Sequence, residues 1–363
     1  MKRAISVVLV FAAMYVLCWA VNTSDACTAI RVKTTDGSLI VGRSMEFSMD
    51  VHSNFIVIPR GKQYIGTSPY GKGLQWTTKY GTVGVNFFKG DHIFDGLNEK
   101  GLYLSALWLS DAKYQDVTPQ EANITLSPTE LGTWLLSKFS NVAEAKAGIK
   151  KIKVANIIDK NLKIVPPAHC ILHDRSGDCA VIEYVDGKLN IHDNPLGVMT
   201  NEPPFDWQLT NLRNYVDLSP INPKPKELPD ITLKPISMGA GLVGLPGDYT
   251  SPSRFVRTVV FTQAAEKKKT ADEGVDVAIH IMNTFDIFEG VVIGKDNQEK
   301  KLVEKTWWIT IGDLKNRRLY FRTYGNQDIR VINLNKLDFS VNKVRTIPMH
   351  EKPNYEDVTD KAK

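Results

Sequence analysis

Cys27 is the residue in this chain whose type and position most clearly suggest chemistry. It directly follows Ser24-Asp25-Ala26, in which small residues occupy the −3 and −1 positions of an export-signal cleavage site. Cleavage after Ala26 would make Cys27 the first residue, with a free α-amino group whose ordinary pKa is roughly 7.7–8.0. One residue would then supply both nucleophile and base. The alternative is that Cys27 is simply the first buried residue of a strand.

Residues 1–26 have the pattern of an export signal. Lys2 and Arg3 form a positive n-region, and residues 4–21 form an almost unbroken apolar run. We therefore expect residues 1–26 to be cleaved and residues 27–363 to form a single exported domain, periplasmic or secreted. No later apolar run reaches membrane-spanning length, so we expect no stable membrane insertion of the mature protein. The formal net charge of +5, with both signs scattered, gives no case for nucleic-acid binding.

A β-hairpin is predicted to position Cys27. Apolar runs on both sides of Asp36-Gly37 are typical of two strands joined by a tight turn. With a two-residue loop, Glu46 lies opposite Cys27 and places a carboxylate beside the new amine. Arg43 then lies opposite Ile30 and faces the other side of the hairpin, unless a bulge redirects it. An exposed, charged strand end is the alternative for Glu46.

The remaining cysteines leave Cys27 as the odd thiol. Cys18 lies in the predicted signal, and Cys170 and Cys179 flank a turn-rich stretch between two β-type runs. A disulfide across that hairpin is compatible with an oxidising compartment. Two separate core thiols are equally compatible with the sequence.

Strand blocks alternate with helix pairs along the rest of the chain, which predicts an α+β fold without strict βαβ alternation. Capping signals at Ser127, Asn141 and Thr270, and Ser251-Pro252, open the predicted helices. Predicted strands cover residues 54–59, 82–88, 102–109, 168–172, 179–184, 189–192, 307–311 and 318–324.

Common cofactor and metal motifs do not explain this chain. Residues 239–244 match G-x-G-x-x-G, but Pro246 and Gly247 follow where a phosphate-binding helix should begin. The sequence contains no H-E-x-x-H, C-x-x-C or G-x-S-x-G, and its seven histidines show no metal-ligand spacing. We expect no metal and no cofactor. Arg254, in the first turn of a predicted helix, opposes the helix dipole and suggests an anionic or strongly accepting partner, although a plain surface arginine is the alternative.

Several ordered motifs resemble the choloylglycine hydrolase family of N-terminal-nucleophile hydrolases, which includes bile salt hydrolases and penicillin V acylases. The resemblance spans essentially the whole chain after the signal. It rests on Cys27-Thr28, Gly42-Arg43-Ser44-Met45, Leu97-Asn98-Glu99-Lys100-Gly101-Leu102, Met199-Thr200-Asn201, Gly244-Leu245-Pro246-Gly247-Asp248 and Ser253-Arg254-Phe255.

The resemblance implies a four-layer αββα fold and hydrolysis of linear, non-peptide amides. It implies Cys27, Arg43, Glu46, Asn201 and Arg254 as catalytic residues. Asn201 would donate its side-chain amide to the oxyanion, and the two arginines would keep the surroundings of the thiolate electropositive. Glu46 stands where many members have aspartate, which leaves its placement open.

Trp108 is a second departure from the bile salt hydrolase pattern, which has asparagine there. Its backbone N–H could still complete the oxyanion hole. Trp108 and Phe47 are similar to the Gram-negative penicillin V acylase branch, in which aromatic residues line the acyl pocket. We therefore rank penicillin V and long-chain N-acyl homoserine lactones above conjugated bile salts as substrates. Core packing is the alternative role for both aromatics.

Two further expectations concern partners. The resemblance suggests a homotetramer, with the proline-rich excursion from Ser219 to Pro235 as an assembly element. The alternative from a different functional class is a non-catalytic exported binding protein or lipoprotein with the same fold. Ser24-Asp25-Ala26 argues against lipidation, because it lacks the apolar residue expected three positions before a lipobox cysteine.

Overall fold

The computed structural model describes residues 26–296 and 298–362. All of the predicted signal except Ala26 lies outside the described residues. Within those two ranges, no helix is both long enough and apolar enough to cross a membrane.

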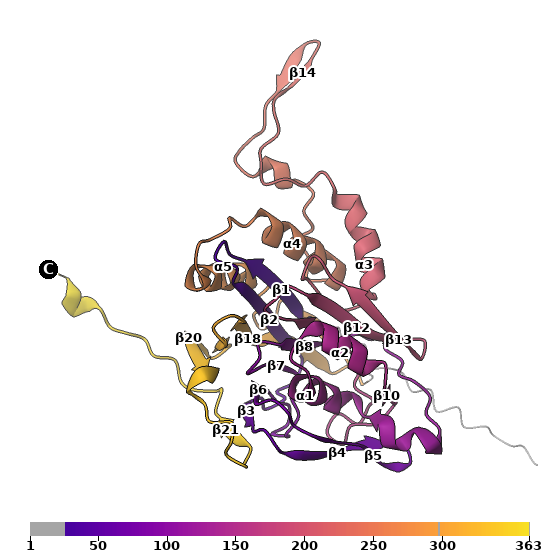
Figure 1. The fold of residues 1–363 in the computed structure, drawn as a ribbon. Helices are drawn as coiled ribbons and strands as arrows, with labels where there is room; N and C mark the ends of the chain where they lie inside the picture. The colour runs from indigo at the N-terminus through magenta and orange to yellow at the C-terminus, as the bar shows by residue number, and fades with distance from the viewer. Residues whose placement is uncertain (1–25, 297, 363) are drawn as a thin grey trace, which may run out of the picture.

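Two antiparallel sheets pack face to face at the centre of the fold (Figure 1). The first has the order β1 (Thr28–Lys33), β2 (Leu39–Phe47), β18 (Lys305–Asp313), β19 (Arg318–Thr323) and β20 (Asn326–Asn333). The second has the order β13 (Lys188–Asp193), β12 (Cys179–Val185), β11 (Ala168–His173), β8 (Tyr103–Trp108), β7 (Asp95–Asn98), β6 (Thr82–Val85), β3 (Phe55–Ile58) and β21 (Arg345–Ile347). Buried side chains from both sheets form the central core, including Val41, Leu107, Ile171 and Trp308.

Helices cover the outer face of each sheet. Helices α1 (Pro128–Lys138) and α2 (Val142–Ile149) pack on the second sheet through Leu104, Leu135 and Ile149. Helices α4 (Ser251–Ala264) and α5 (Ala271–Asn283) cover the first sheet, with Ile40 and Met282 in the shared core. Helix α3 (Phe205–Leu212) packs beside α4. The predicted four-layer αββα fold is therefore confirmed.

Short elements complete the described chain. They are the strands β4 (Gln63–Ser68), β5 (Gly71–Thr77), β9 (Thr125–Leu126), β10 (Lys153–Val154), β14 (Lys226–Leu228), β15 (Ile231–Leu233), β16 (Ile293–Lys295) and β17 (Lys301–Val303), and the 3-10 turns η1 (Pro119–Ile124), η2 (Arg213–Tyr215), η3 (Ala240–Leu242), η4 (Leu334–Lys336) and η5 (Thr359–Lys361).

The predicted capping residues Ser127, Asn141 and Thr270 begin their helices, whereas α4 is capped by Thr250, one residue before the predicted Ser251. The Ser127 N–H donates to Glu130 Oε2 at 2.8 Å, and the Thr270 N–H donates to a Glu273 carboxylate oxygen at 2.9 Å. Each bond satisfies a backbone donor that the helix itself leaves without a partner.

The register predicted for the first hairpin is wrong by one residue. Ala29, rather than Ile30, lies opposite Arg43, because Thr34 and Ser38 close a three-residue loop. Gly37 occupies the left-handed position of that loop, with φ of 78°. A one-residue shift moves every side chain to the opposite face. Arg43 therefore shares its face of the hairpin with the Cys27 side chain, toward the second sheet, whereas Glu46 has the opposite parity.

Cys170 and Cys179 are separate buried thiols, so the disulfide alternative is wrong. In the antiparallel pairing of β11 with β12, Cys170 lies opposite Ile182 and Cys179 lies opposite His173. The two cysteines are thus displaced along the strands.

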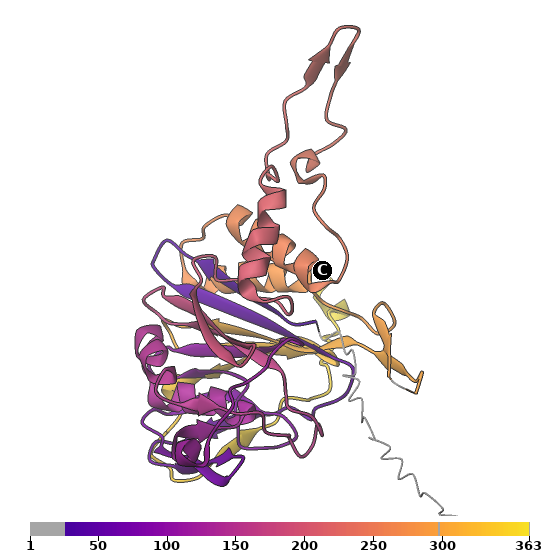
Figure 2. The ribbon, with the colours of Figure 1, turned by 90° about the vertical axis from the view of Figure 1, so that its right-hand side faces the viewer.

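Residues 213–250 form an arm that projects far from the body, with the β14–β15 hairpin near its tip (Figures 1 and 2). Its apolar side chains are unusually exposed: Ile221 is 76%, Ile236 101% and Met238 91% accessible. The proline-rich excursion identified in the sequence lies within this arm.

Candidate active site

Three of the predicted site residues contact Cys27 directly. Cys27 precedes β1 and is only 2% exposed. Its N–H donates to Asn201 Oδ1 at 2.7 Å, and its carbonyl oxygen accepts from Arg254 Nη1 at 2.5 Å. Arg43 Nη2 lies 3.4 Å from the Cys27 Sγ. The backbone and the thiol of one residue are thus held from separate directions.

Arg43 is a buried cation on the thiol side of β2. Its Nη2 also donates to the Ala106 carbonyl oxygen at 3.1 Å, and its guanidinium lies 4.5 Å from the centre of the Trp308 ring. These contacts hold the guanidinium in place, and its positive charge stabilises a thiolate over a thiol. Within the described residues, its Nε and Nη1 have no hydrogen-bond partner.

Asn201 connects the loop before α3 to the start of β1. That loop is attached to β1 by a pair of backbone bonds between Met199 and Ala29. The Asn201 Oδ1 accepts from Arg254 Nη2 at 2.8 Å as well as from Cys27, and its Nδ2 donates to the Trp108 carbonyl oxygen at 2.9 Å. Two donors face the amide oxygen and an acceptor faces the amide nitrogen, so the orientation of the side-chain amide is determined.

The Trp108 backbone N–H points to the same side of β8 as its carbonyl oxygen. The Ala106 N–H donates to the Phe94 carbonyl oxygen, on the β7 side of the strand. The Leu109 N–H donates to the Pro167 carbonyl oxygen, on the β11 side. Since donor directions alternate along a strand, the Trp108 N–H lies on the Ala106 side. Asn201 approaches Trp108 there, so both predicted oxyanion donors belong to one side of β8.

Glu46 is buried, and it interacts electrostatically with Arg254, the arginine that donates to the Cys27 carbonyl oxygen. Its carboxylate oxygens accept from Thr306 Oγ1 at 2.8 Å and from Ser44 Oγ at 3.0 Å. Burial raises the pKa of Glu46 to about 8, although the nearby charge of Arg254 acts in the opposite direction. The structure gives Glu46 no direct hydrogen bond to a cation among the described residues, and a cation at this point would favour its ionised form.

Glu304 is a second acid at this position, and sequence reasoning missed it. Its Oε1 accepts the Ala26 N–H at 2.5 Å, and the residue is only 4% exposed. Burial raises the pKa of Glu304 to about 7, and the charges of Glu46 and Glu304 oppose each other. Two carboxylates therefore lie around the Ala26–Cys27 bond. No local motif marks Glu304, which precedes β18 and reaches Ala26 from 278 positions away.

Phe47 and Trp108 contact each other, as the predicted aromatic pocket requires. Their ring centres lie 5.8 Å apart in an edge-on arrangement. Phe47 has the same strand parity as Arg43 and so faces the thiol side of β2. Trp307 Nε1 donates to the Phe47 carbonyl oxygen at 3.0 Å, at the point where a bulge interrupts the β2–β18 register.

Metal ligands do not gather in the described part of the chain, where no cluster of three or more His, Cys, Asp or Glu side chains could hold an ion. The arrangement of Cys27, Arg43, Asn201 and Arg254 can instead support attack by a sulfur nucleophile on a carbonyl group.

Comparisons with known proteins agree with this geometry. Residues 27–347 match the family described as linear amide C–N hydrolases, choloylglycine hydrolase family. The bile salt hydrolase/transferase of Clostridium perfringens is 31% identical over 328 residues, covering 88% of this chain and 96% of that protein.

Solved structures give the same result. A mutant of the conjugated bile acid hydrolase from Clostridium perfringens superposes with a TM-score of 0.81 at 29% identity, covering 92% of this chain and 100% of that one. Penicillin V acylase from Agrobacterium tumefaciens superposes with a TM-score of 0.72 at 27% identity, covering 89% and 91%. The chain therefore belongs to the choloylglycine hydrolase family and is a hydrolase of linear amide C–N bonds.

Proposed function

We propose that this protein removes apolar acyl groups from small amines, as a penicillin V acylase or an N-acyl homoserine lactone acylase, using Cys27 as an N-terminal nucleophile. The observation that carries this proposal is the convergence of Arg43, Asn201 and Arg254 on the backbone and thiol of Cys27.

The chemistry begins with the removal of Ala26. The Cys27 nitrogen then becomes an amine while Asn201 Oδ1 remains in place to accept from it. The amine takes the thiol proton, directly or through a water, and Arg43 stabilises the resulting thiolate. Glu46 and Glu304 supply negative charge to the ammonium that forms.

Attack on the substrate carbonyl forms a carbon–sulfur bond and places negative charge on the carbonyl oxygen. Asn201 Nδ2 carries two hydrogens and gives one to the Trp108 carbonyl, so the other can be donated to this oxygen together with the Trp108 N–H. The C–N bond breaks, the leaving amine takes the proton from the Cys27 ammonium, and a thioester remains. Water, deprotonated by the Cys27 amine, hydrolyses the thioester and restores the thiol.

The proposed substrate class rests on the two aromatic side chains, Phe47 and Trp108, on the thiol side of the site. Phe47 and Trp108 offer aromatic surface, which favours a phenoxyacetyl group or a fatty acyl chain. A conjugated bile salt is the second candidate, because the relative from Clostridium perfringens is named as a bile salt hydrolase.

A substrate panel tests both candidates. Purified protein is given penicillin V, a long-chain acyl homoserine lactone, and glycine- and taurine-conjugated bile salts, and the released amine is quantified. We expect the first two to be cleaved fastest, and Cys27→Ser to lose at least about 10³-fold in turnover. Full activity of Cys27→Ser would refute the mechanism. Preferential cleavage of bile salts would refute the substrate ranking alone.

Export and processing form part of the proposal. The match to the family begins at Cys27, which supports a mature protein starting there. Intact mass of the exported protein, before and after thiol alkylation under native conditions, measures the first residue. A mass beginning at Cys27 with one rapidly alkylated site agrees with the proposal. A start elsewhere, or a lipid on Cys27, would favour the binding-protein alternative.

Assembly through the arm is also proposed. The exposed apolar side chains of residues 213–250, such as Ile236 and Met238, suit contacts between copies of the chain in a homotetramer. Light scattering of the wild type and of a variant with residues 219–235 replaced by a short Gly-Ser linker tests this role. We expect a tetramer and a smaller species, respectively, whereas a monomeric wild type would exclude it.

A further inference from the structure

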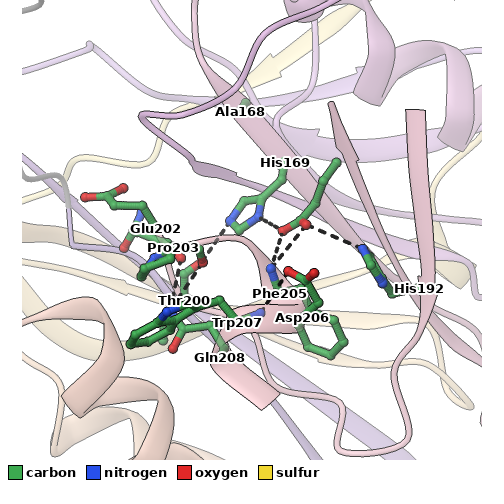
Figure 3. A network of polar contacts seen from close by, with 12 residues as sticks. Ala168, His169, His192, Thr200, Glu202, Pro203, Phe205, Asp206, Trp207 and Gln208 are labelled. Atoms are coloured by element: carbon green, nitrogen blue, oxygen red, sulfur yellow. Dashed lines mark hydrogen bonds and ion pairs between the residues drawn. The ribbon is translucent and has the colours of Figure 1, made fainter. Parts of the chain in front are cut away.

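Next to Thr200, a histidine and a glutamate form a buried pair on the second sheet (Figure 3). His169 lies in β11 and Glu183 in the neighbouring β12, and their side chains are each only 1% exposed. No sequence motif considered above includes either residue.

Both ring nitrogens of His169 face oxygen atoms. Nδ1 lies 2.8 Å from Glu183 Oε1, and Nε2 lies 2.8 Å from the Thr200 carbonyl oxygen. A carbonyl oxygen can only accept, so Nε2 carries a hydrogen. A neutral imidazole has one N–H, so the Nδ1 contact with Glu183 requires a second proton on one of the two partners.

The contacts of Glu183 place that proton on His169. Both Glu183 oxygens accept the Phe205 N–H, at 3.1 and 3.2 Å, and His192 Nε2 lies 3.6 Å away. Burial raises the pKa of Glu183, but the hydrogen bond and charge of His169 and the Phe205 N–H together leave that pKa below its ordinary value. With Glu183 ionised, the Nδ1 contact is a hydrogen bond that His169 donates, and the ring then carries a hydrogen on both nitrogens.

This pair holds both ends of a short loop. Thr200, whose carbonyl accepts from His169, directly precedes Asn201, and Phe205, whose N–H donates to Glu183, begins α3. Figure 3 shows the loop between them, with the ring of His169 directed at Thr200. Displacement of the Thr200 carbonyl would move the Asn201 side chain away from Cys27 and Trp108.

We propose that His169 is a positioning residue, whose imidazolium holds the Thr200 carbonyl and thereby orients Asn201 toward the nucleophile and the oxyanion. This inference rests on the role proposed above for Asn201. A neutral His169 would present a lone pair to one of its two oxygen partners, and that contact would become repulsive.

Kinetics of two matched variants test the proposal. His169→Gln removes the imidazolium, whereas His280→Gln changes an exposed histidine on α5. We expect His169→Gln to lower kcat about 10- to 100-fold with a smaller change in KM, because a small displacement of a catalytic donor acts mainly on the transition state. The control should keep the wild-type kcat and KM.

A spectroscopic measurement protects the test against a variant that fails to fold. In wild-type protein labelled with ¹⁵N-histidine, an imidazolium gives two ring nitrogens with similar chemical shifts, whereas a neutral ring gives two widely separated shifts. Because both ring nitrogens face oxygen atoms, we expect the buried His169 to show the imidazolium pattern. A neutral ring, or a folded His169→Gln enzyme with wild-type kcat, would overturn the inference. Absence of amidase activity in the wild type would overturn the proposed function instead and leave the spectroscopic result standing.

Discussion

Two buried glutamates near the site have pKa values shifted in opposite directions. Burial raises the pKa of Glu46 to about 8, whereas the pKa of Glu183 lies below its ordinary value despite burial. The hydrogen bonds to Glu46 come from two hydroxyls, whereas the partners of Glu183 are His169 and a backbone N–H. A buried carboxylate is stable when a cation pairs with it and costly when only neutral donors do.

The comparison indicates that the site around Glu46 is incomplete while Ala26 is attached. Glu304 adds a second carboxylate beside the Ala26 N–H. Cleavage after Ala26 would create an ammonium group in this region and supply the missing positive charge. The Glu183 site already contains its cation and can serve as a rigid support.

The largest effect is expected at Asn201, which contacts Cys27 directly. Asn201→Leu keeps a similar shape but removes the amide that faces Cys27, Arg254 and Trp108. We expect kcat to fall about 10²–10³-fold, the usual cost of losing an oxyanion donor. Steady-state kinetics measure it, with Asn354→Leu in the exposed C-terminal segment as control. A loss below about threefold would contradict the proposed role.

The next effect concerns the stability of the unprocessed chain. Folding raises the pKa of Glu46 from 4.5 to about 8. The contribution of Glu46 to the free energy of unfolding is therefore fully present below pH 4.5 and is lost as the pH rises through 8. Glu46→Gln should therefore stabilise the unprocessed protein at pH 9, by on the order of a few kcal/mol, and have little effect at pH 5. Urea unfolding at both pH values measures the difference.

Removal of residues 1–26 should abolish the stabilising effect of Glu46→Gln. Under the proposed processing the new ammonium would pair with Glu46, so Glu46→Gln should no longer stabilise the mature protein at pH 9. An equal stabilisation of both forms would show that the amine is not the partner of Glu46.

A smaller effect is expected from Glu304. Glu304→Gln removes one of the two carboxylates near the amine, which lowers the population of the ammonium–thiolate pair. We expect kcat/KM to fall about tenfold or less, with the pH profile displaced to lower pH. Glu289→Gln, which changes an exposed partner of Lys305, is the matched control. Identical profiles for the two variants would assign Glu304 a packing role only.

The smallest effect is expected at His192. It lies 3.6 Å from Glu183, but its side chain is 29% exposed, and partly exposed ion pairs contribute little. His192→Gln should change the free energy of unfolding by less than about 1 kcal/mol and leave kcat nearly unchanged. A loss as large as that of His169→Gln would mean that His192, rather than His169, supplies the cation for Glu183.

Local signals in the sequence predicted much of the fold. The capping boxes at Ser127 and Thr270 begin α1 and α5 because their hydrogen bonds span only three residues. Helix α2 begins after the predicted cap Asn141 and ends at Ile149. Helix α3 and the β4–β5 hairpin were not predicted. The register of the first hairpin was wrong because an apolar pattern does not distinguish a two-residue loop from a three-residue loop.

The sequence by itself indicated the family and the layered fold, because several contiguous motifs match, and the resemblance implied Cys27, Arg43, Asn201 and Arg254 as site residues. The tertiary structure alone decided which face of the hairpin Arg43 occupies and which additional acids and bases surround the site. Glu304 reaches Ala26 across 278 positions, and His169 reaches Thr200 across 31. Contacts between residues so far apart depend on how strands and loops pack, and no local pattern encodes them.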